Sequence, residues 1–217
     1  MKTPISEVYN EDCIEGMKRF PDNYFDLGLI DPPYGIGVTN MKMGGRKTVS
    51  SINKSKNWDD KTPSTSFFDE LFRVCKNPII WGGNYFHLPL SQYFCIWDKG
   101  ETMYGRDFAE MEYAWVKTGG TRIFKKSPNQ LDRFHPTQKP VALYTWLLES
   151  YAKQGDKILD THLGSQSSRI AAYKKGFDFV GFEIDKDYFN QGNERFLKSI
   201  AMPLFDAPVQ PKQLSLI

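Results

Sequence analysis

Residues 157–185 read KILDTHLGSQSSRIAAYKKGFDFVGFEID, and this stretch decides the fold class. Two short apolar runs, 157–159 and 179–182, enclose a segment of helical composition at 167–175. Gly176 follows that segment directly, where helices commonly end on a residue in the left-handed conformation. A strand, a helix and a second strand in this order predict a βαβ unit, which joins two parallel strands of one sheet.

The rest of the chain repeats this alternation of apolar runs and amphipathic stretches, which is typical of an open α/β sheet. The pattern predicts further strands at 25–30, 78–81, 93–97 and 111–116, and further helices at 11–19, 66–75, 141–152 and 187–200. The helix at 141–152 is the clearest, because Leu147, Leu148 and Tyr151 recur at helical spacing behind Pro140. We expect a mostly parallel sheet with flanking helices within residues 1–200.

Composition excludes several classes of protein. The 217 residues include 28 Lys and Arg against 26 Asp and Glu, and a net charge of +2 does not by itself indicate a nucleic-acid binder. Cys13, Cys75 and Cys95 are widely separated, which argues against a disulfide framework or a zinc site and favours a reducing compartment. No metal is expected. No apolar run approaches the roughly 18 residues of a membrane span, so we expect no membrane partner.

The motif Asp31-Pro32-Pro33-Tyr34 directly follows the apolar run 25–30. Ligands of open α/β sheets bind at the carboxyl ends of the strands, so chemistry is expected here. The two prolines fix φ and remove two backbone donors, which leaves a rigid loop with a carboxylate, free carbonyls and one aromatic ring. This set suits a flat heterocycle with an amino group, which Asp31 and the Pro32 carbonyl bind while Tyr34 stacks on it. The alternative is a plain turn.

The turn from Asp160 to Ser165 leads from a predicted strand into a predicted helix. Gly164 lets a ligand approach the backbone closely, and the helix start offers free amides. Glu183 ends the next strand at the position where Rossmann-like folds hold ribose hydroxyls with a carboxylate. The spacing fits an adenosyl cofactor, although Gln166 stands where the usual pattern has a second glycine.

Together these motifs resemble the S-adenosylmethionine-dependent amino-methyltransferases of DNA, in the permuted order that places the catalytic motif before the cofactor motifs. The resemblance covers about residues 6 to 198, and it is closest to the short enzymes of phages and prophages. Its motifs are DPPY, PIIWGGNYF, CIWDKG, EMEYAW, HPTQKP at 135–140, LDTHLGS and GFEID. The resemblance implies a Rossmann-like S-adenosylmethionine methyltransferase fold, S-adenosylmethionine as cofactor, and the cytoplasm of a bacterial or phage-infected cell as the setting.

The resemblance also implies roles for individual residues. Asp31, with the Pro32 carbonyl, becomes the catalytic acceptor and Tyr34 the residue that stacks on the base. The implied cofactor contacts are Asp12, Thr137, Lys139, Asp160, Gly164, Ser165 and Glu183. Asp12 has a helix N-cap as its alternative role, and Thr137 and Lys139 match a segment that lines the methionine end of the cofactor. His135 and His162 lack metal partners at useful spacing, so a structural role is expected for both.

The implied reaction is transfer of a methyl group to the N6 amino group of adenine in a base flipped out of duplex DNA. Methylation of the cytosine 4-amino group is an alternative, although cytosine enzymes of the family more often carry serine in place of Asp31. An inactive DNA-binding or replication-accessory module that kept the fold is another. Methylation at cytosine carbon 5 is not expected, because it needs a nucleophilic thiolate, usually after proline, and no cysteine here follows a proline.

Two basic segments, near 38–62 and 120–136, are predicted to contact double-stranded DNA. The candidate residues are Arg46, Lys47, Lys54, Lys56, Arg122, Lys125 and Lys126. The alternative is two solvated loops, since runs of charge commonly keep a surface wet. Little chain remains for a large recognition domain, so we expect a short recognition site or relaxed specificity. Whether a restriction enzyme accompanies the protein stays open.

Residues 201–217 are expected to form an extended tail, because three prolines exclude a continuing helix. The last five residues resemble the short peptide with which bacterial replication proteins dock on the sliding clamp. Gln213 would bond at the mouth of a groove while Leu214, Leu216 and Ile217 fill apolar pockets. The alternative is a frayed terminus without function. Pairing into a homodimer is also left open.

Overall fold

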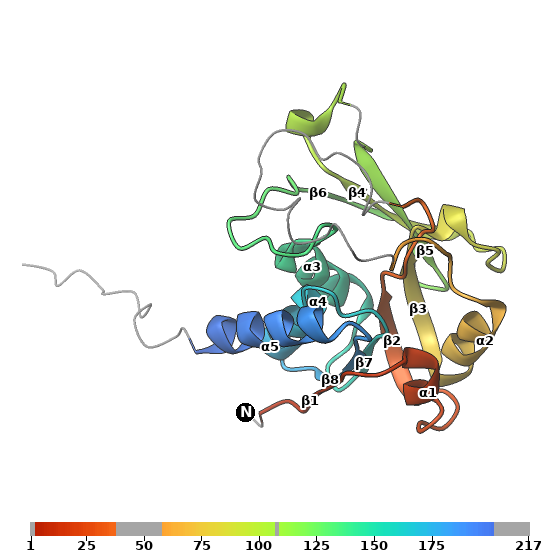
Figure 1. The fold of residues 1–217 in the computed structure, drawn as a ribbon. Helices are drawn as coiled ribbons and strands as arrows, with labels where there is room; N and C mark the ends of the chain where they lie inside the picture. The colour runs from red at the N-terminus through yellow and green to blue at the C-terminus, as the bar shows by residue number, and fades with distance from the viewer. Residues whose placement is uncertain (1–2, 38–57, 107–108, 202–217) are drawn as a thin grey trace, which may run out of the picture.

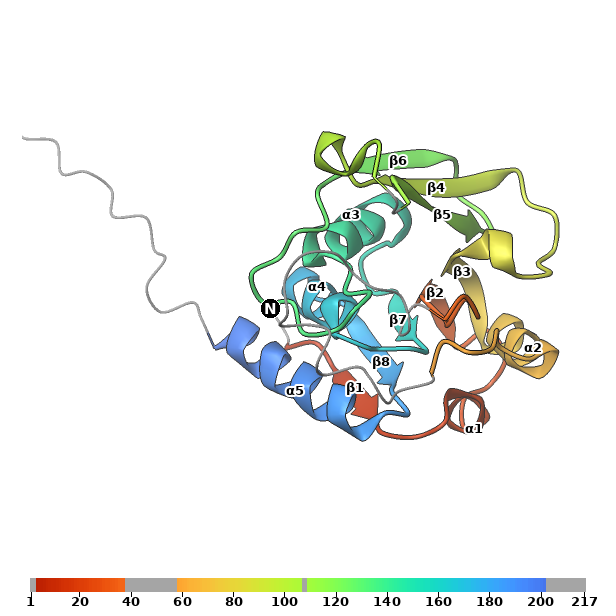
Figure 2. The ribbon, with the colours of Figure 1, turned by 45° about the horizontal axis from the view of Figure 1, so that its top comes forward.

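An eight-stranded sheet separates two layers of helices in the computed structural model, which describes residues 3–37, 58–106 and 109–201 (Figures 1 and 2). The strands are β1 (Ser6–Tyr9), β2 (Phe25–Ile30), β3 (Cys75–Trp81), β4 (Tyr93–Asp98), β5 (Met111–Val116), β6 (Arg122–Lys125), β7 (Lys157–Asp160) and β8 (Asp178–Phe182). The helices are α1 (Cys13–Met17), α2 (Thr65–Val74), α3 (Val141–Tyr151), α4 (Ser167–Lys175) and α5 (Lys186–Ile200), with short 3₁₀ turns at Gly83–Tyr85 and Glu101–Met103.

The strand order is β1-β8-β7-β2-β3-β5-β4-β6. The first five strands of this order are parallel, β5 runs antiparallel between β3 and β4, and β6 is parallel to β4. The expected α/β class with a mostly parallel sheet is confirmed. The carboxyl ends of β1, β2, β7 and β8 consequently meet at one edge of the sheet.

Each face of the sheet buries its own apolar cluster. Leu27 and Leu29 of β2 point to the face covered by α3 and α4, whereas Ile30 points to the face covered by α1 and α2. In β3, Ile79 and Trp81 join the first cluster and Ile80 joins the second. Strands buried on both faces are apolar almost throughout, which is why these runs stand out in the sequence.

Two strands were not expected from the sequence. β1 and β6 have four residues each, and β6 lies inside the segment expected to be a basic loop at 120–136. Both are outer strands of the sheet, and each is paired with a strand distant in sequence or across a loop. Short, half-exposed edge strands carry little apolar periodicity, so their pairing partners decide that they form.

Several predicted residues lie outside the described part of the chain. These are the basic residues Arg46, Lys47, Lys54 and Lys56, and the tail residues Gln213, Leu214, Leu216 and Ile217. Within the described ranges, every helix is too short or too polar to cross a membrane.

Candidate active site

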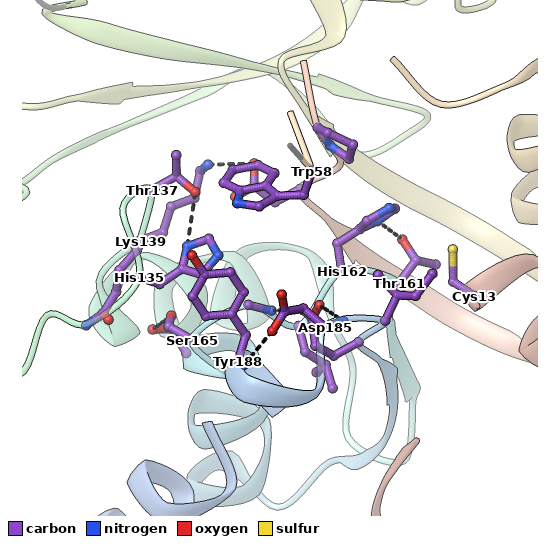
Figure 3. Close-up of a pocket in the computed structure, with 18 of the residues that line it drawn as sticks. Cys13, Trp58, His135, Thr137, Lys139, Thr161, His162, Ser165, Asp185 and Tyr188 are labelled. Atoms are coloured by element: carbon purple, nitrogen blue, oxygen red, sulfur yellow. Dashed lines mark hydrogen bonds and ion pairs between the residues drawn. The ribbon is translucent and has the colours of Figure 1, made fainter. Parts of the chain in front are cut away.

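A pocket opens at the sheet edge where the carboxyl ends of the parallel strands meet (Figure 3). Its walls come from the segments that follow β1, β2, β7 and β8, and from the HPTQKP segment before α3. Asp31, Thr137, Lys139, Gly164, Ser165 and Glu183 line it, as does Asp12. Segments that are more than a hundred residues apart in sequence therefore form one site, at the edge where the sequence motifs predicted it.

The Asp31 carboxylate is held by two donors, both of which reach its Oδ1 atom. Lys139 Nζ lies 2.6 Å from this oxygen and the Tyr34 hydroxyl 2.7 Å from it. Asp59 fixes the loop from the other side, accepting hydrogen bonds from the backbone N–H groups of Tyr34 (2.7 Å) and Gly35 (3.1 Å). Burial raises the pKa of Asp31, and the Lys139 ammonium opposes that rise. These contacts hold the carboxylate and its loop in position.

Lys139 is expected at the methionine end of the cofactor, and the structure places its ammonium in a buried cluster of charges at the pocket wall. Its side chain is 3% exposed, and Nζ lies 3.0 Å from Glu112 Oε2 as well as 2.6 Å from Asp31. Lys99 Nζ lies 2.9 Å from the other oxygen of Glu112. Burial by itself would raise the pKa of Glu112, but the two ammonium groups lower it to about 2.

The Tyr34 ring has its position fixed by the segment after β3. Gly82 has φ +67°, and a Cβ added there would lie 2.3 Å from Tyr34 Cε1. Tyr85 stacks on Tyr34, with ring centroids 5.1 Å apart and 12° between the planes. Burial raises the pKa of Tyr34 well above 10, so its hydroxyl stays protonated and donates to Asp31. A glycine is needed at position 82 for this arrangement.

Glu183 and Gly164 both line the pocket and are hydrogen-bonded to each other. Glu183 Oε2 accepts a hydrogen bond from the Gly164 backbone (2.8 Å), and Oε1 accepts one from the Asp185 backbone (2.9 Å). Asp160 lies behind this turn and is 2% exposed, where it accepts hydrogen bonds from the His162 N–H (2.9 Å) and the Ser168 hydroxyl. Burial raises the pKa of Asp160 to about 7. Asp160 thus stabilises the turn by hydrogen bonds and does not itself line the pocket.

Gln166 adopts the backbone conformation that glycine usually supplies at this turn, with φ 58° and ψ 27°. Its side chain is fully buried and packs against Gly192 of α5, so it points away from the pocket. Its amide bonds to the Phe189 carbonyl, to Asn193 Oδ1 and to Arg169. Hydrogen bonds of the Gln166 side chain therefore stabilise a left-handed backbone conformation that a glycine would adopt without strain.

Asp12 takes the N-cap role that was the alternative for it, and it also lies on the wall of the pocket. Its Oδ1 accepts hydrogen bonds from the backbone N–H groups of Ile14 (2.8 Å) and Glu15 (3.2 Å), which makes it the N-cap of α1. Thr137 also lines the pocket, with its hydroxyl 3.3 Å from His135 Nδ1.

Sequence reasoning missed an aromatic wall of the pocket formed by Trp58, His135 and Tyr188 (Figure 3). The His135 ring lies 4.3 Å from Tyr188 and 5.5 Å from Trp58, measured between centroids. Trp58 Nε1 is buried and has no hydrogen-bond partner among the described residues. Trp58 lies at the end of a basic segment without periodicity, so no sequence signal singled it out.

His162 also lines the pocket, and burial lowers its pKa to about 4, so it is neutral at pH 7. Its Nδ1 lies 2.8 Å from the Thr161 hydroxyl. No group of three metal-ligating side chains occurs within residues 3–37, 58–106 and 109–201.

Comparison with known proteins shows that the chain is similar to DNA methylases. Residues 96–194 match the family model of N6/N4 DNA methylases. Over these residues the chain is similar to the N6/N4 DNA methylases. This methylase is 26% identical to YubD of Escherichia coli (strain K12), a protein named as a methylase, over 88% of the chain and 90% of YubD.

Solved structures share the fold of this methylase. TTHA0409 of Thermus thermophilus, named as a DNA modification methylase and solved with S-adenosyl-L-methionine, superposes with a TM-score of 0.60 at 19% identity, over 92% of this chain and 96% of that one. The cytosine-N4-specific PvuII DNA methyltransferase gives 0.59 at 14% identity, over 91% and 93%. TTHA0409 thus binds the cofactor that the sequence motifs imply for this chain.

Proposed function

We propose that this methylase transfers a methyl group from S-adenosylmethionine to the N6 amino group of adenine in DNA. The observation that carries the proposal is the Asp31 carboxylate, fixed through Oδ1 on the wall of the pocket beside the Tyr34 ring. Aspartate at this position supports adenine, because cytosine enzymes of the family more often carry serine there.

The pocket has the donor and acceptor groups that S-adenosylmethionine requires. Glu183 would accept hydrogen bonds from the ribose hydroxyls, with Asp12 near the adenine and Thr137 and Ser165 toward the methionine end. The buried Nε1 of Trp58, which lacks a partner among the described residues, fits a polar group of a ligand. When bound, the cofactor supplies an electrophilic methyl group on a sulfonium sulfur.

The residues of the chain prepare the acceptor. The amino nitrogen of adenine is a poor nucleophile, because its lone pair is delocalised into the ring. Asp31 Oδ2, on which no described residue makes a hydrogen bond, and the Pro32 carbonyl would accept the two amino hydrogens and stabilise the positive charge that grows on nitrogen. Tyr34 supplies the stacking surface that offsets part of the cost of flipping the base, which is a few kcal/mol.

The proposal is tested by incubating DNA with the protein and S-adenosylmethionine and identifying the methylated nucleosides by mass spectrometry. We expect N6-methyladenine from the wild type and none from Asp31→Ala, whose affinity for S-adenosylmethionine should stay within about twofold of the wild type. Asp69→Ala, on the exposed side of α2, is the matched control and should methylate normally. N4-methylcytosine as the product, or an active Asp31→Ala, would overturn the assignment.

DNA contact is proposed for Lys125 and Lys126, at the carboxyl end of β6. The register places Lys125 beside Asp98, at the same sheet edge as Asp31, whereas Arg122 lies at the other end of β6 over the Tyr151 ring. Replacing both lysines with glutamine should flatten the salt dependence of DNA binding, because fewer phosphate contacts release fewer counterions. Arg122→Gln is the control, and an equal effect from it would contradict the placement.

The remaining partners stay predictions. Arg46, Lys47, Lys54 and Lys56 are tested by the same salt titration. The clamp-binding tail is tested by a pull-down with protein truncated after Pro211, for which equal recovery of the clamp with and without the tail would contradict the idea. A homodimer is tested by light scattering.

A further inference from the structure

We propose that Lys139, held in place by Glu112, is a positioning residue for methyl transfer that keeps the Asp31 carboxylate charged and oriented toward the target amine. The inference rests on the proposed function and deepens it. It assigns Lys139 to the acceptor side of the reaction, where the sequence had suggested the cofactor side.

Three separate parts of the fold converge on the Lys139 ammonium. Asp31 follows β2, Glu112 lies near the start of β5, and Lys139 directly precedes the N-cap of α3. The ammonium lies 2.6 Å from Asp31 and 3.0 Å from Glu112, and 3.4 Å from the Tyr34 hydroxyl. With a side chain that is 3% exposed, Lys139 has little access to water and depends on these partners.

The charges of this cluster balance. Asp31 and Glu112 are two carboxylates, and Lys139 and Lys99 are two ammonium groups, with Lys139 between the carboxylates. Loss of Lys139 would leave Asp31 buried and facing the negative charge of Glu112. Both influences raise the pKa of Asp31, so a protonated Asp31 would result. A protonated carboxyl stabilises the developing positive charge on the amine far less than a carboxylate does.

Glu112 influences the reaction indirectly, through Lys139. Asp31 and Lys139 line the pocket, and Glu112 is joined to it through Lys139. Its negative charge has two opposing consequences. It anchors the ammonium, and it raises the pKa of Asp31. Neutralising Glu112 should consequently shift the ionisation of Asp31 in the direction opposite to that caused by neutralising Lys139.

Other ionisable groups also face the cluster and could contribute to the pH dependence of the reaction rate. These are Tyr34, Tyr144, Lys99, Arg133 and Asp160. Burial raises the pKa of Asp160 to about 7, within the pH range of the test. Every variant below retains all five, so differences between the pH profiles report on Lys139 and Glu112.

The test is the single-turnover rate of methyl transfer from pH 5.5 to 9.5, at saturating S-adenosylmethionine, for the wild type, Lys139→Met, Lys139→Arg and Glu112→Gln. We expect Lys139→Met to lose about 100-fold at pH 7 and to recover about tenfold per pH unit above it, because Asp31 then ionises only at higher pH. The acid limb of Glu112→Gln should move to lower pH. Lys139→Arg retains the cation and should keep the wild-type profile even if its rate is lower.

Binding of S-adenosylmethionine, measured by calorimetry, separates this role from a cofactor contact. We expect its Kd for Lys139→Met to stay within about threefold of the wild type. A deficit of equal size at every pH, or acid limbs that move together in Lys139→Met and Glu112→Gln, would overturn the proposal. So would a tenfold or greater rise in Kd with a normal saturated rate.

The rates are measured on whichever amine the wild type methylates. A cytosine product would therefore refute the adenine assignment while leaving this test intact. If Lys139→Met does not fold, as judged by circular dichroism, the shift of the acid limb in Glu112→Gln and its absence in Lys139→Arg decide the outcome.

Discussion

Replacing Gln166 with glycine should destabilise this methylase, although glycine is the residue that cofactor turns of this kind usually carry there. The left-handed backbone of Gln166 costs on the order of 1 kcal/mol, which glycine would recover. The substitution also frees a buried side chain, which returns roughly 1.5 kcal/mol of conformational entropy. Judged by backbone conformation alone, the glycine variant should be the more stable protein.

The contacts of the side chain outweigh these gains. Gln166 makes three hydrogen bonds inside the protein, to Phe189, Asn193 and Arg169, at about 1 kcal/mol each. Its two buried methylene groups, packed against Gly192, contribute about 0.8 kcal/mol each. The balance is a loss of about 2 kcal/mol, which lowers the Tm of a chain of this size by roughly 4–8 °C.

Thermal and urea unfolding of the cofactor-free protein measure this loss. Gln166→Ala keeps the left-handed strain and loses the same contacts, so it should be less stable than Gln166→Gly by about 1 kcal/mol. Gln154→Gly, in an exposed turn, is the control and should change stability by less than about 1 kcal/mol. A Gln166→Gly protein that melts at or above the wild-type temperature would refute the reasoning.

Three further substitutions test other parts of the site. Because burial raises the pKa of Asp160 to about 7, the folded state retains a proton that the unfolded chain releases near pH 4. The wild type should therefore lose a few kcal/mol of stability relative to Asp160→Asn as the pH rises from 4 to 8. A constant difference between the two unfolding free energies in urea across this range would contradict this. Glu183→Gln should raise the Kd for S-adenosylmethionine at least about tenfold in calorimetry. The carboxylate charge is lost, and one of the two backbone N–H groups that donate to Glu183 would face an amide NH₂ instead. An unchanged Kd would show that Glu183 does not bind the cofactor. Gly82→Ala should displace Tyr34, since a Cβ would lie 2.3 Å from Tyr34 Cε1, and should slow methyl transfer while cofactor affinity is kept; a normal rate would show that the ring position is not critical.

Sequence periodicity located the elements that bury apolar residues on both sides. β2, β5 and α4 have the bounds that the pattern predicts, because an apolar run, or a segment of helical composition closed by a glycine, is a local property of the chain. β1 and β6 were not predicted, since their four residues are stabilised by distant pairing partners. The DPPY, HPTQKP and LDTHLGS motifs placed chemistry at one edge of the sheet, which is where the pocket lies.

The sequence by itself determined the class of fold and supplied the motifs that resemble DNA amino-methyltransferases, because glycine, proline and apolar spacing act over a few residues. Tertiary structure alone decided what those residues contact. Lys139 reaches Asp31 across 108 positions and meets Glu112 from a third element, and Gln166 turns toward α5 instead of the pocket. These pairings depend on strand order and helix packing, which bring distant segments within a few ångströms of each other. A local sequence pattern does not reveal which distant segments will meet.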